Sequence, residues 1–455
     1  MATRTRMGAV DTMWLDMDRR NNLMVIESVV LLGGRADWDL LRAVVMERML
    51  ERYPVFGCRP ETDLLGRSYW VQDDHFDLDL HLVPVTLPAP GDDRALEEYV
   101  EEQASRPLPH DRPMWELHLV DGYARGSALY SRCHHSLADG MALMQVLLSL
   151  TDPAPEDETA VDPDEQPPDD DGAQSGTSGL LSPLADLAAV PVGVAQHVLS
   201  PQAWRRDLTT AEQAVGVAAK LLLARKPASP VDGPPETAKR VLWSDPVPLA
   251  GLGEAAHRAG VTINDLLVAA LAGALHTYVS QQHGTAVDIP TMVPVNLRDP
   301  AKPLPRALGN EFALVLLSLP SSLPTPFTRL AETKRRMDAI KHSPEPVITF
   351  ATSWAIGNTR GAVESSLVDF FANKATGVTT NVIGPRKERY LAGVPVVGLL
   401  GWAPESGDQT ISTCLITYAG TARVGFKVDA WKVTEPEELV TAFGEELAAL
   451  ERVAS

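Results

Sequence analysis

Two adjacent histidines, His134 and His135, are the residues of this sequence whose type and setting best suit catalysis. They follow a strand-like run from Ala128 to Cys133 and precede an apolar helical run from Gly140 to Leu150. A loop between a strand and a helix holds its side chains on rigid neighbours. A neutral imidazole can accept a proton from an alcohol, because its ordinary pKa is about 6.5. We therefore expect a general base here that activates a hydroxyl group.

Asp139 and Gly140 complete the local pattern His-His-x-x-x-Asp-Gly. Asp139 stands at the expected start of the following helix, and Gly140 allows a tight turn or the close approach of a ligand. Neighbouring histidines could also belong to a metal site, but no third ligand follows at a suitable spacing, so we predict no metal and no cofactor. The sequence contains no G-x-S-x-G elbow, no Walker loop and no dinucleotide fingerprint, which argues against a serine hydrolase.

The elements that position these residues alternate between helix and strand. Helical spacing is found in the runs Asp39 to Arg52, Leu96 to Ser105, Leu252 to Ala259, Leu266 to Val279 and Glu435 to Val453. Strand patterns are found in Trp115 to Gly122, Ala128 to Cys133, Ile289 to Val295, Phe312 to Leu319, Thr410 to Tyr418 and Ala422 to Val428. Thr262 and Asp265 form a capping-box pattern before the longest apolar helix. Both halves of the chain are therefore expected to be α/β.

The composition of the 455 residues is that of a soluble globular protein, with 45% hydrophobic and 22% charged residues. A net charge of −20 argues against nucleic acid as a partner. Three widely spaced cysteines allow no disulfide framework, which indicates a reducing, cytoplasmic compartment. No signal peptide or membrane-spanning run is expected.

A change of composition divides the chain. We predict an N-terminal domain over 1–150 and a C-terminal domain over 240–455. Residues 151–179 hold ten acidic residues, five prolines and no Lys or Arg, and we expect a disordered linker there. Residues 180–239 are expected to form connecting helices, although the apolar residues from 180 to 225 could instead contact lipid.

The pattern His134-His135-Ser136-Leu137-Ala138-Asp139-Gly140 resembles the HHxxxDG motif of the CoA-dependent acyltransferase superfamily. Further segments, in the same order, resemble the wax ester synthase/diacylglycerol acyltransferase family within it. They are Pro113-Met114-Trp115-Glu116, with Met in place of Leu; Asn264-Asp265; Val293 to Arg298 with Leu308-Gly309-Asn310; and Thr380 to Pro385, with Thr and Ile substituted. The substitutions at Met114, Thr380 and Ile383 bear on the choice of acceptor more than on activity.

This resemblance implies two chloramphenicol-acetyltransferase-like domains with a substrate tunnel at their interface. It also implies that His135 is the base and that Asp139 points away from the substrate and pairs with Arg298. The alternative for Arg298 is a surface residue before a turn.

The other candidate roles are less specific. Asn264 and Asn381 could contact the substrate or a developing oxyanion, although Asn264 could equally serve the start of its helix. Met114 and Trp115 are expected in the pocket wall or the core. Arg386 and Lys387 could contact the phosphates of CoA, although a solvated surface patch is the commoner arrangement.

The function that the resemblance implies is esterification of a long-chain acyl-CoA with diacylglycerol or a fatty alcohol, with peripheral contact to a membrane or lipid droplet. Two alternatives remain. One is a condensation-type acyltransferase that uses a carrier-protein thioester, and the other is an inactive lipid-droplet protein of the same fold.

Overall fold

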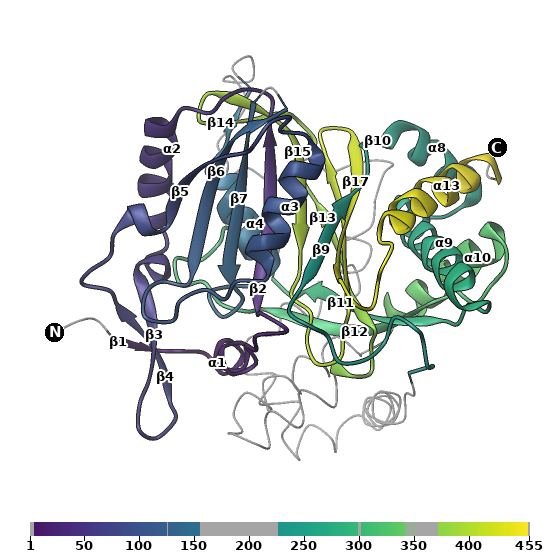
Figure 1. Ribbon diagram of the computed structural model, residues 1–455, viewed down its shortest axis with the longest axis horizontal. Coiled ribbons are helices and arrows are strands. Elements are labelled where there is room, and N and C mark those ends of the chain that lie inside the picture. Colours follow the sequence, from purple (N-terminus) through teal and green to yellow (C-terminus); the bar gives the residue numbers. More distant parts are fainter. Residues whose placement is uncertain are drawn as a thin grey trace.

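The computed structural model describes residues 4–124, 126–154, 226–298, 302–341 and 372–453, together with residues 343 and 349. Two seven-stranded sheets lie side by side in this part of the chain, each with helices packed on it (Figure 1). The α/β class and the two-domain arrangement predicted from the sequence are therefore confirmed.

The first sheet carries the histidine pair at the end of one of its central strands. Its order is β5 (Leu82–Thr86), β6 (Trp115–Tyr123), β7 (Gly126–His134), β2 (Val25–Leu32), β15 (Val394–Trp402), β14 (Arg389–Leu391) and β8 (Asp152–Pro153). The strands β6 and β7 form the predicted antiparallel hairpin, and β2 pairs with β7 so that Val25 is opposite His134.

Side chains of β2 alternate between two hydrophobic clusters, as successive residues of a strand must. Val29 and Leu31 pack with α3 (Asp93–Ala104) on one face. Val30 and Leu32 pack on the other face, in the cluster that includes α2 (Trp38–Val44) and α4 (Gly140–Ser149). A π-helical turn, Val45–Leu50, continues α2. The sheet is thus covered on both faces.

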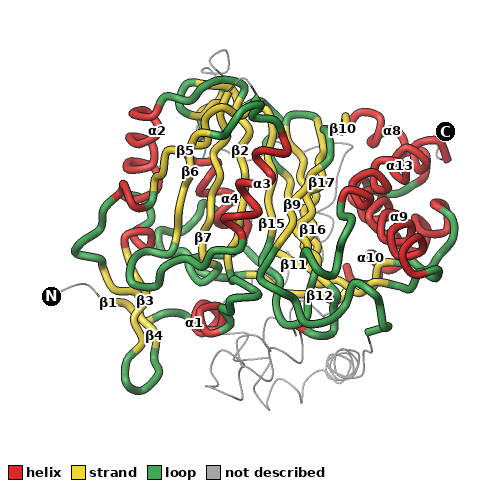
Figure 2. Tube along the Cα trace, viewed as in Figure 1, coloured by secondary structure: helices red, strands yellow, loops and turns green. Residues whose placement is uncertain are grey.

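The second sheet is built from the C-terminal half. Its order is β10 (Val247–Pro248), β17 (Thr421–Asp429), β16 (Ile411–Tyr418), β13 (Gly377–Ile383), β11 (Ile289–Asn296) and β12 (Phe312–Leu319), and β9 (Lys239–Trp243) also pairs with β17. The helices α8 (Leu249–Ala259), α9 (Ile263–His283), α10 (Pro326–Lys341) and α13 (Glu437–Val453) gather beside this sheet (Figure 2).

The remaining elements lie near the N-terminus. A small sheet has the order β1 (Arg4–Arg6), β4 (Ser68–Gln72) and β3 (Cys58–Thr62). The helix α1 (Ala9–Asp16) follows β1, and the short 3₁₀ turns are Pro54–Gly57 and Leu78–Leu80.

The longest apolar helix is α9, and its ends follow the sequence closely. Thr262 accepts a hydrogen bond from the amide of Asp265, and Asp265 accepts one from the amide of Thr262, which completes the predicted capping box. Within the described residues, α9 is the one helix long and apolar enough to cross a membrane. Its most apolar window is 78% buried in the protein, which is typical of a core helix.

The C-terminal half also completes the first sheet, because β15 pairs with β2. Trp402, the last residue of β15, reaches back to the second sheet. A Cβ atom at Gly425 of β17 would lie 2.9 Å from the Trp402 Nε1 atom, so glycine is needed for this close approach. A buried ion pair also joins the sheets, since Lys427 Nζ lies 3.0 Å from Glu27 Oε2. The two sheets are therefore tied by covalent connection, packing and charge.

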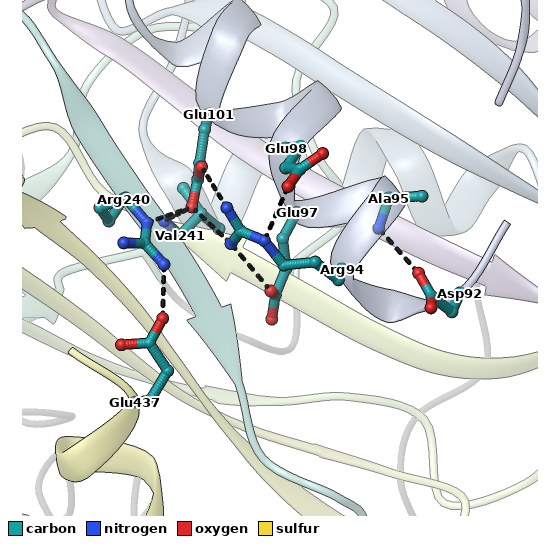
Figure 3. A network of polar contacts seen from close by, with 9 residues as sticks. All are labelled: Asp92, Arg94, Ala95, Glu97, Glu98, Glu101, Arg240, Val241 and Glu437. Atoms are coloured by element: carbon teal, nitrogen blue, oxygen red, sulfur yellow. Dashed lines mark hydrogen bonds and ion pairs between the residues drawn. The ribbon is translucent and has the colours of Figure 1, made fainter. Parts of the chain in front are cut away.

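A second contact between the halves lies at the solvent edge (Figure 3). Glu101 of α3 accepts a hydrogen bond from Arg240 Nε of β9 at 2.9 Å and one from the amide of Val241 at 3.1 Å. Arg240 also contacts Glu437 of α13 at 2.5 Å. The side chains of Arg240 and Glu101 are only 26% and 13% exposed, and their contact holds α3 against β9, whereas Glu437 is 60% exposed and its pair with Arg240 contributes little stability.

The predicted linker begins later than its composition suggested. Thr151 is buried and its hydroxyl accepts a hydrogen bond from Arg389 Nε at 2.9 Å, while Asp152 and Pro153 form β8. These residues therefore belong to the edge of the first sheet. Residues 155–179 of the predicted linker and 180–225 of the predicted connecting helices lie outside the described residues. The described remainder of the connecting segment, residues 226–238, is irregular and not helical, and Lys239 begins β9.

Candidate active site

His135 lies just beyond the end of β7 and is held by its backbone and by its ring. Its amide donates to the carbonyl of Met24 at 2.7 Å. The imidazole stacks on Trp14 of α1, with ring centroids 4.0 Å apart and planes at 13°, and Phe312 of β12 lies 5.4 Å away. Two aromatic rings from distant segments thus fix the position of this side chain.

The ring of His135 is neutral in the folded protein. Burial lowers its pKa to about 4, and the opposing influences are its own backbone carbonyl and the Asp139 carboxylate. Its Nδ1 atom is buried and makes no hydrogen bond of regular geometry within the described residues. A neutral imidazole at neutral pH has the lone pair that a general base requires.

Asn310 links the His135 backbone to α1. Its Nδ2 atom donates to the His135 carbonyl at 2.9 Å and to Asp11 Oδ1 at 2.8 Å. Asp11 Oδ1 also accepts from the Asn310 amide at 3.2 Å. Burial raises the pKa of Asp11 to about 6, against the lowering effect of the Asn310 hydrogen bonds. The catalytic loop is therefore tied to both halves of the chain.

Asp139 has three hydrogen-bond partners within the described residues, and His135 is not one of them. As the N-cap of α4 it accepts from the Ala142 amide at 2.9 Å. Its Oδ2 atom accepts from an Arg298 guanidinium nitrogen at 2.8 Å and from the Glu311 amide at 3.0 Å. The structure thus brings Asp139 and Arg298 together as a buried pair, rather than leaving Arg298 at the surface.

The first histidine has surroundings of its own. His134 is fully buried, and its Nδ1 atom lies 2.8 Å from Ser136 Oγ and accepts from the Ser136 amide at 3.2 Å. Its Nε2 atom faces Asp18 Oδ2 at 3.8 Å, and burial lowers the pKa of this ring to about 3. The two consecutive histidines thus contact different groups. His134 contacts Ser136 and faces Asp18, whereas His135 stacks on Trp14.

Asn264 and Asn381 contact each other across the second half. Asn381 Nδ2 donates to Asn264 Oδ1 at 2.5 Å, which joins β13 to the first turn of α9. No hydrogen bond of the described residues joins this pair to His135. A role toward an oxyanion or the substrate stays a prediction.

Met114 and Trp115 are core residues with no exposed surface. The Trp115 indole donates to the Phe56 carbonyl at 2.7 Å and stacks with His81, whereas the Met114 carbonyl accepts from the His134 amide at 3.0 Å. The structure therefore places both in the packing behind the histidine loop, where they support it rather than face a substrate.

The predicted CoA contacts lie far from the base along the strand direction. Arg386 and Lys387 are exposed in the turn between β13 and β14, and β14 pairs with the start of β15. Register places that end of β15 beside Leu32, at the opposite end of β2 from Val25 and His134. At about 3.3 Å per residue, the length of β2 alone separates Arg386 and Lys387 from His135 by roughly 20 Å.

Gly140 is exposed, and a Cβ atom there would meet nothing within 4 Å, so packing does not require glycine.

The predicted tunnel is not shown by the described residues. A cavity of ≈ 10 Å³, about the space of one water molecule, lies between β2, α4 and β15 and is lined by Met144, Leu147, Arg389 and Leu399 among others. An open path for a long acyl chain stays a prediction.

Sequence reasoning missed several residues of the site. Asp11, Trp14 and Phe312 carry no local pattern that marks them, and Asn310 was noted only as part of a resemblance. Their partners stand more than a hundred residues away in the chain, which a local motif cannot reveal. Asp18 and His110 lie beside His134 and were also missed. Asp18 is far from His134 in the chain, and His110 stands in the loop before the strand hairpin, at no spacing typical of a metal motif. They supply the further potential ligands that the local spacing lacked.

Comparison with known proteins agrees with this geometry. The wax ester synthase/diacylglycerol acyltransferase catalytic domain matches residues 7–267, and the C-terminal domain of the same family matches residues 308–451. A probable diacylglycerol O-acyltransferase of Mycobacterium tuberculosis is 25% identical, with 96% of this chain and 92% of that protein covered. A second relative from the same species, also named as a diacylglycerol O-acyltransferase, is 27% identical over 98% of both chains.

Solved structures show the same fold. The wax ester synthase/diacylglycerol acyltransferase from Marinobacter aquaeolei VT8 has a TM-score of 0.68 at 22% identity, with 99% of both chains covered. The first condensation domain of the calcium-dependent antibiotic synthetase has a TM-score of 0.62 at 17% identity, with 99% of this chain and 97% of that chain covered. The two family domains together span most of the chain, and the chain therefore belongs to the wax ester synthase/diacylglycerol acyltransferase family of acyltransferases.

Proposed function

We propose that this enzyme transfers the acyl group of a long-chain acyl-CoA to the hydroxyl of diacylglycerol or a fatty alcohol, with His135 as general base. The observation that carries the proposal is the environment of His135: a neutral ring, stacked on Trp14, with its backbone held by Met24 and Asn310. Membership of the wax ester synthase/diacylglycerol acyltransferase family supports diacylglycerol or a fatty alcohol as the acyl acceptor.

The reaction needs one base and no covalent enzyme intermediate. Proton transfer through Nε2 requires the ring proton of His135 to be on Nδ1, and we place it there. Nε2 takes the hydroxyl proton while the oxygen attacks the thioester carbonyl. The tetrahedral intermediate then collapses, the C–S bond breaks, and the CoA thiolate receives the proton from His135. Ester and free CoA are the products.

Arg298 and Asp139 act on this step through position. By holding the start of α4 they fix the turn from His135 to Gly140, so that the base meets the hydroxyl in one orientation. Asn264 and Asn381 are candidates for stabilising the oxyanion, and Arg386 with Lys387 for the CoA phosphates.

The test is turnover by the purified protein with palmitoyl-CoA and a panel of acceptors that includes diolein and hexadecanol. CoA release and ester formation are both measured. Because one positioned base typically contributes about a hundredfold to ten-thousandfold, His135→Ala should lose nearly all turnover. His75→Ala, which changes an exposed histidine, is the matched control.

The same assay separates the alternatives. Transfer only from a carrier-protein thioester would identify a condensation-type enzyme, and no transfer from either donor would identify an inactive member of the fold. A His135→Ala protein that keeps most of its activity would refute the assignment of the base.

The substrates proposed are insoluble in water, so we also propose that the enzyme lies in the cytoplasm and contacts a membrane or lipid droplet at its surface. The apolar residues 180–223, with Arg205, Arg206 and Lys220 among them, are the candidate contact segment. That segment lies outside the described residues.

A further inference from the structure

Three potential metal ligands converge at the first residue of the histidine pair, His134. Asp18 follows α1, His110 lies in the loop before β6, and His134 ends β7. Asp18 Oδ2 lies 3.3 Å from His110 Nε2 and 3.8 Å from His134 Nε2. One donor atom from each of the three residues lies within 4.8 Å of the others.

His134 Nε2 is the atom that the folded chain leaves without a partner. The residue is 0% exposed, and within the described residues this nitrogen makes no hydrogen bond. A buried polar atom without a partner costs free energy and calls for an explanation. Here the atom faces a carboxylate oxygen and lies near a second imidazole, so that three donor atoms gather where one ion could contact them all.

Ser136 can support the tautomer that a metal requires. Ligation through Nε2 puts the ring proton on Nδ1. Nδ1 then gives up the hydrogen bond that it accepts from the Ser136 amide at 3.2 Å and donates to Ser136 Oγ, which lies 2.8 Å away. Histidine ligands in metal sites usually have such a partner on the second nitrogen.

We propose that Asp18, His110 and His134 bind a divalent transition-metal ion, with zinc as the ion that fits best. Two imidazoles and one carboxylate are a common zinc donor set. Tetrahedral zinc with bonds of about 2.1 Å requires donors roughly 3.4 Å apart, so the three donor atoms, which lie within 4.8 Å of one another, need only small movements. The side chain of His110 is 45% exposed, which gives the ion a path from solvent and leaves room for water as the fourth ligand.

The ion acts on the loop and does not touch the substrate. Asp18 Oδ1 accepts from the Met24 amide at 2.8 Å, and the Met24 carbonyl accepts from the His135 amide at 2.7 Å. Zinc bound to Asp18 and His134 therefore fastens both sides of the segment that carries His135. The site is structural, and its occupancy is independent of which acyl acceptor the enzyme uses.

The experiment uses the full-length protein after treatment with a chelator and dialysis. Zinc chloride is titrated by calorimetry, and bound zinc is measured after gel filtration. The expected result is one zinc per chain with a melting temperature several degrees higher when zinc is in excess. His110→Ala should remove this binding and the thermal shift, and the exposed His75→Ala should retain both.

Two further variants protect the test against misfolding. Asp18→Asn keeps an acceptor for the Met24 amide and loses the anionic ligand, so it should fold normally and bind zinc at least about tenfold more weakly. Ser136→Ala should weaken zinc binding by about tenfold through loss of the Nδ1 partner. Zinc bound equally by His110→Ala and wild-type protein would show binding elsewhere on the surface, and no zinc bound by wild-type protein would show a metal-free His–Asp contact; either result overturns the proposal. Neither result depends on acyl transfer.

Discussion

Asp139 shows how a residue of a catalytic motif can serve the fold. It caps α4, accepts the Glu311 amide and pairs with Arg298, and its side chain is 4% exposed. A buried carboxylate with a matched guanidinium is stable only while both partners are present, because the unpaired charge left behind is poorly solvated. We therefore expect this pair to affect activity through the position of the loop.

Removal of Arg298 should destabilise the protein and lower its activity together. We expect Arg298→Ala to cost about 3–5 kcal/mol in unfolding free energy, because Asp139 is left buried and unpaired. Asp139→Asn should retain the helix cap and still lose stability, since the charge is gone and Arg298 remains. Thermal melting and turnover are the measurements.

The exposed pair Arg35–Asp121 provides the control, as the Arg35 side chain is 81% exposed. Arg35→Ala should change the unfolding free energy by less than about 1 kcal/mol. Normal melting of both Arg298→Ala and Asp139→Asn would show that the buried pair contributes nothing.

Asp11 should make stability depend on pH. Its pKa is raised from 3.8 to about 6 in the folded protein, so the folded state holds its proton more tightly than the unfolded state does. Stability from this group is present at low pH and is lost as the pH rises through about 4 to 6. The loss amounts to at most about 3 kcal/mol, and less because solvent reaches part of the side chain.

The variant Asp11→Asn removes that loss and keeps an oxygen that can accept from Asn310. The melting temperature of the variant minus that of the wild type should therefore be larger at pH 7 than at about pH 4.5. Asp39→Asn, an exposed site on α2, makes the same change of charge and should show no such trend. If the difference in melting temperature between Asp11→Asn and wild type were equal at both pH values, folding would not raise the pKa of Asp11.

At the scale of elements, α1 is the feature that completes the site. It lies far from β7 in sequence, yet Trp14 stacks on the base and Asp11 binds the Asn310 that holds the His135 carbonyl. Trp14 also forms a small apolar cluster with Val10, Met13 and Met24. The helix therefore positions the base from one side while α4 holds the loop from the other.

The ring at position 14 should matter more than its indole nitrogen. Trp14→Ala leaves a cavity beside His135, and we expect kcat to fall by about tenfold to a hundredfold because the base is no longer held in one orientation. Trp14→Phe keeps a stacked ring and removes an Nε1–H that is buried without a partner within the described residues, so its kcat should stay close to that of the wild type. Equal losses of kcat in both variants would assign the effect to the indole N–H and not to stacking.

At the scale of the whole molecule, the C-terminal half of the chain contributes strands to both large sheets. The strand β15 comes from the C-terminal half and pairs with β2 of the first sheet, while Arg298 and Phe312 bring the second half to the histidine loop. The site therefore exists only when both halves are in place. We expect that the acidic segment between the two halves is not needed to form the site.

Replacement of residues 155–179 by a neutral flexible linker of equal length should leave turnover nearly unchanged, because so acidic and proline-rich a segment has little apolar surface to bury. Thr151 to Ala154 are kept, since Thr151 and β8 are part of the first sheet. Steady-state kinetics and melting are compared with the wild type. A large loss of turnover with unchanged melting would show that the segment contacts substrate.

Lipid binding can be assigned by vesicle sedimentation. Changing leucines within residues 180–223 to serine should release the protein from vesicles, since each buried methylene contributes about 0.8 kcal/mol to insertion. The comparison is Leu64→Ser with Leu65→Ser at the tip of the β3–β4 hairpin, where the two side chains are 105% and 63% exposed. Loss of binding in the hairpin variant alone would transfer the contact surface to that hairpin.

The sequence by itself determined much of the local structure of this protein and predicted His134 and His135 as its candidate chemical centre. Helix and strand periods predicted α3, α4, α9, β6, β7 and the β16–β17 hairpin, because those periods depend on neighbours within a few residues. The histidine motif and the capping box of α9 are equally local. The resemblance in several ordered segments carried the family and the Asp139–Arg298 contact.

Only the tertiary structure decided what surrounds the base. The placement of β15 in the first sheet, of Trp14 on His135 and of Asp18 and His110 beside His134 all join segments far apart in the chain. Such contacts depend on how whole sheets and helices pack, and no local period or spacing encodes them. For that reason the sequence could predict a candidate base, His135, and could not identify the residues that hold it.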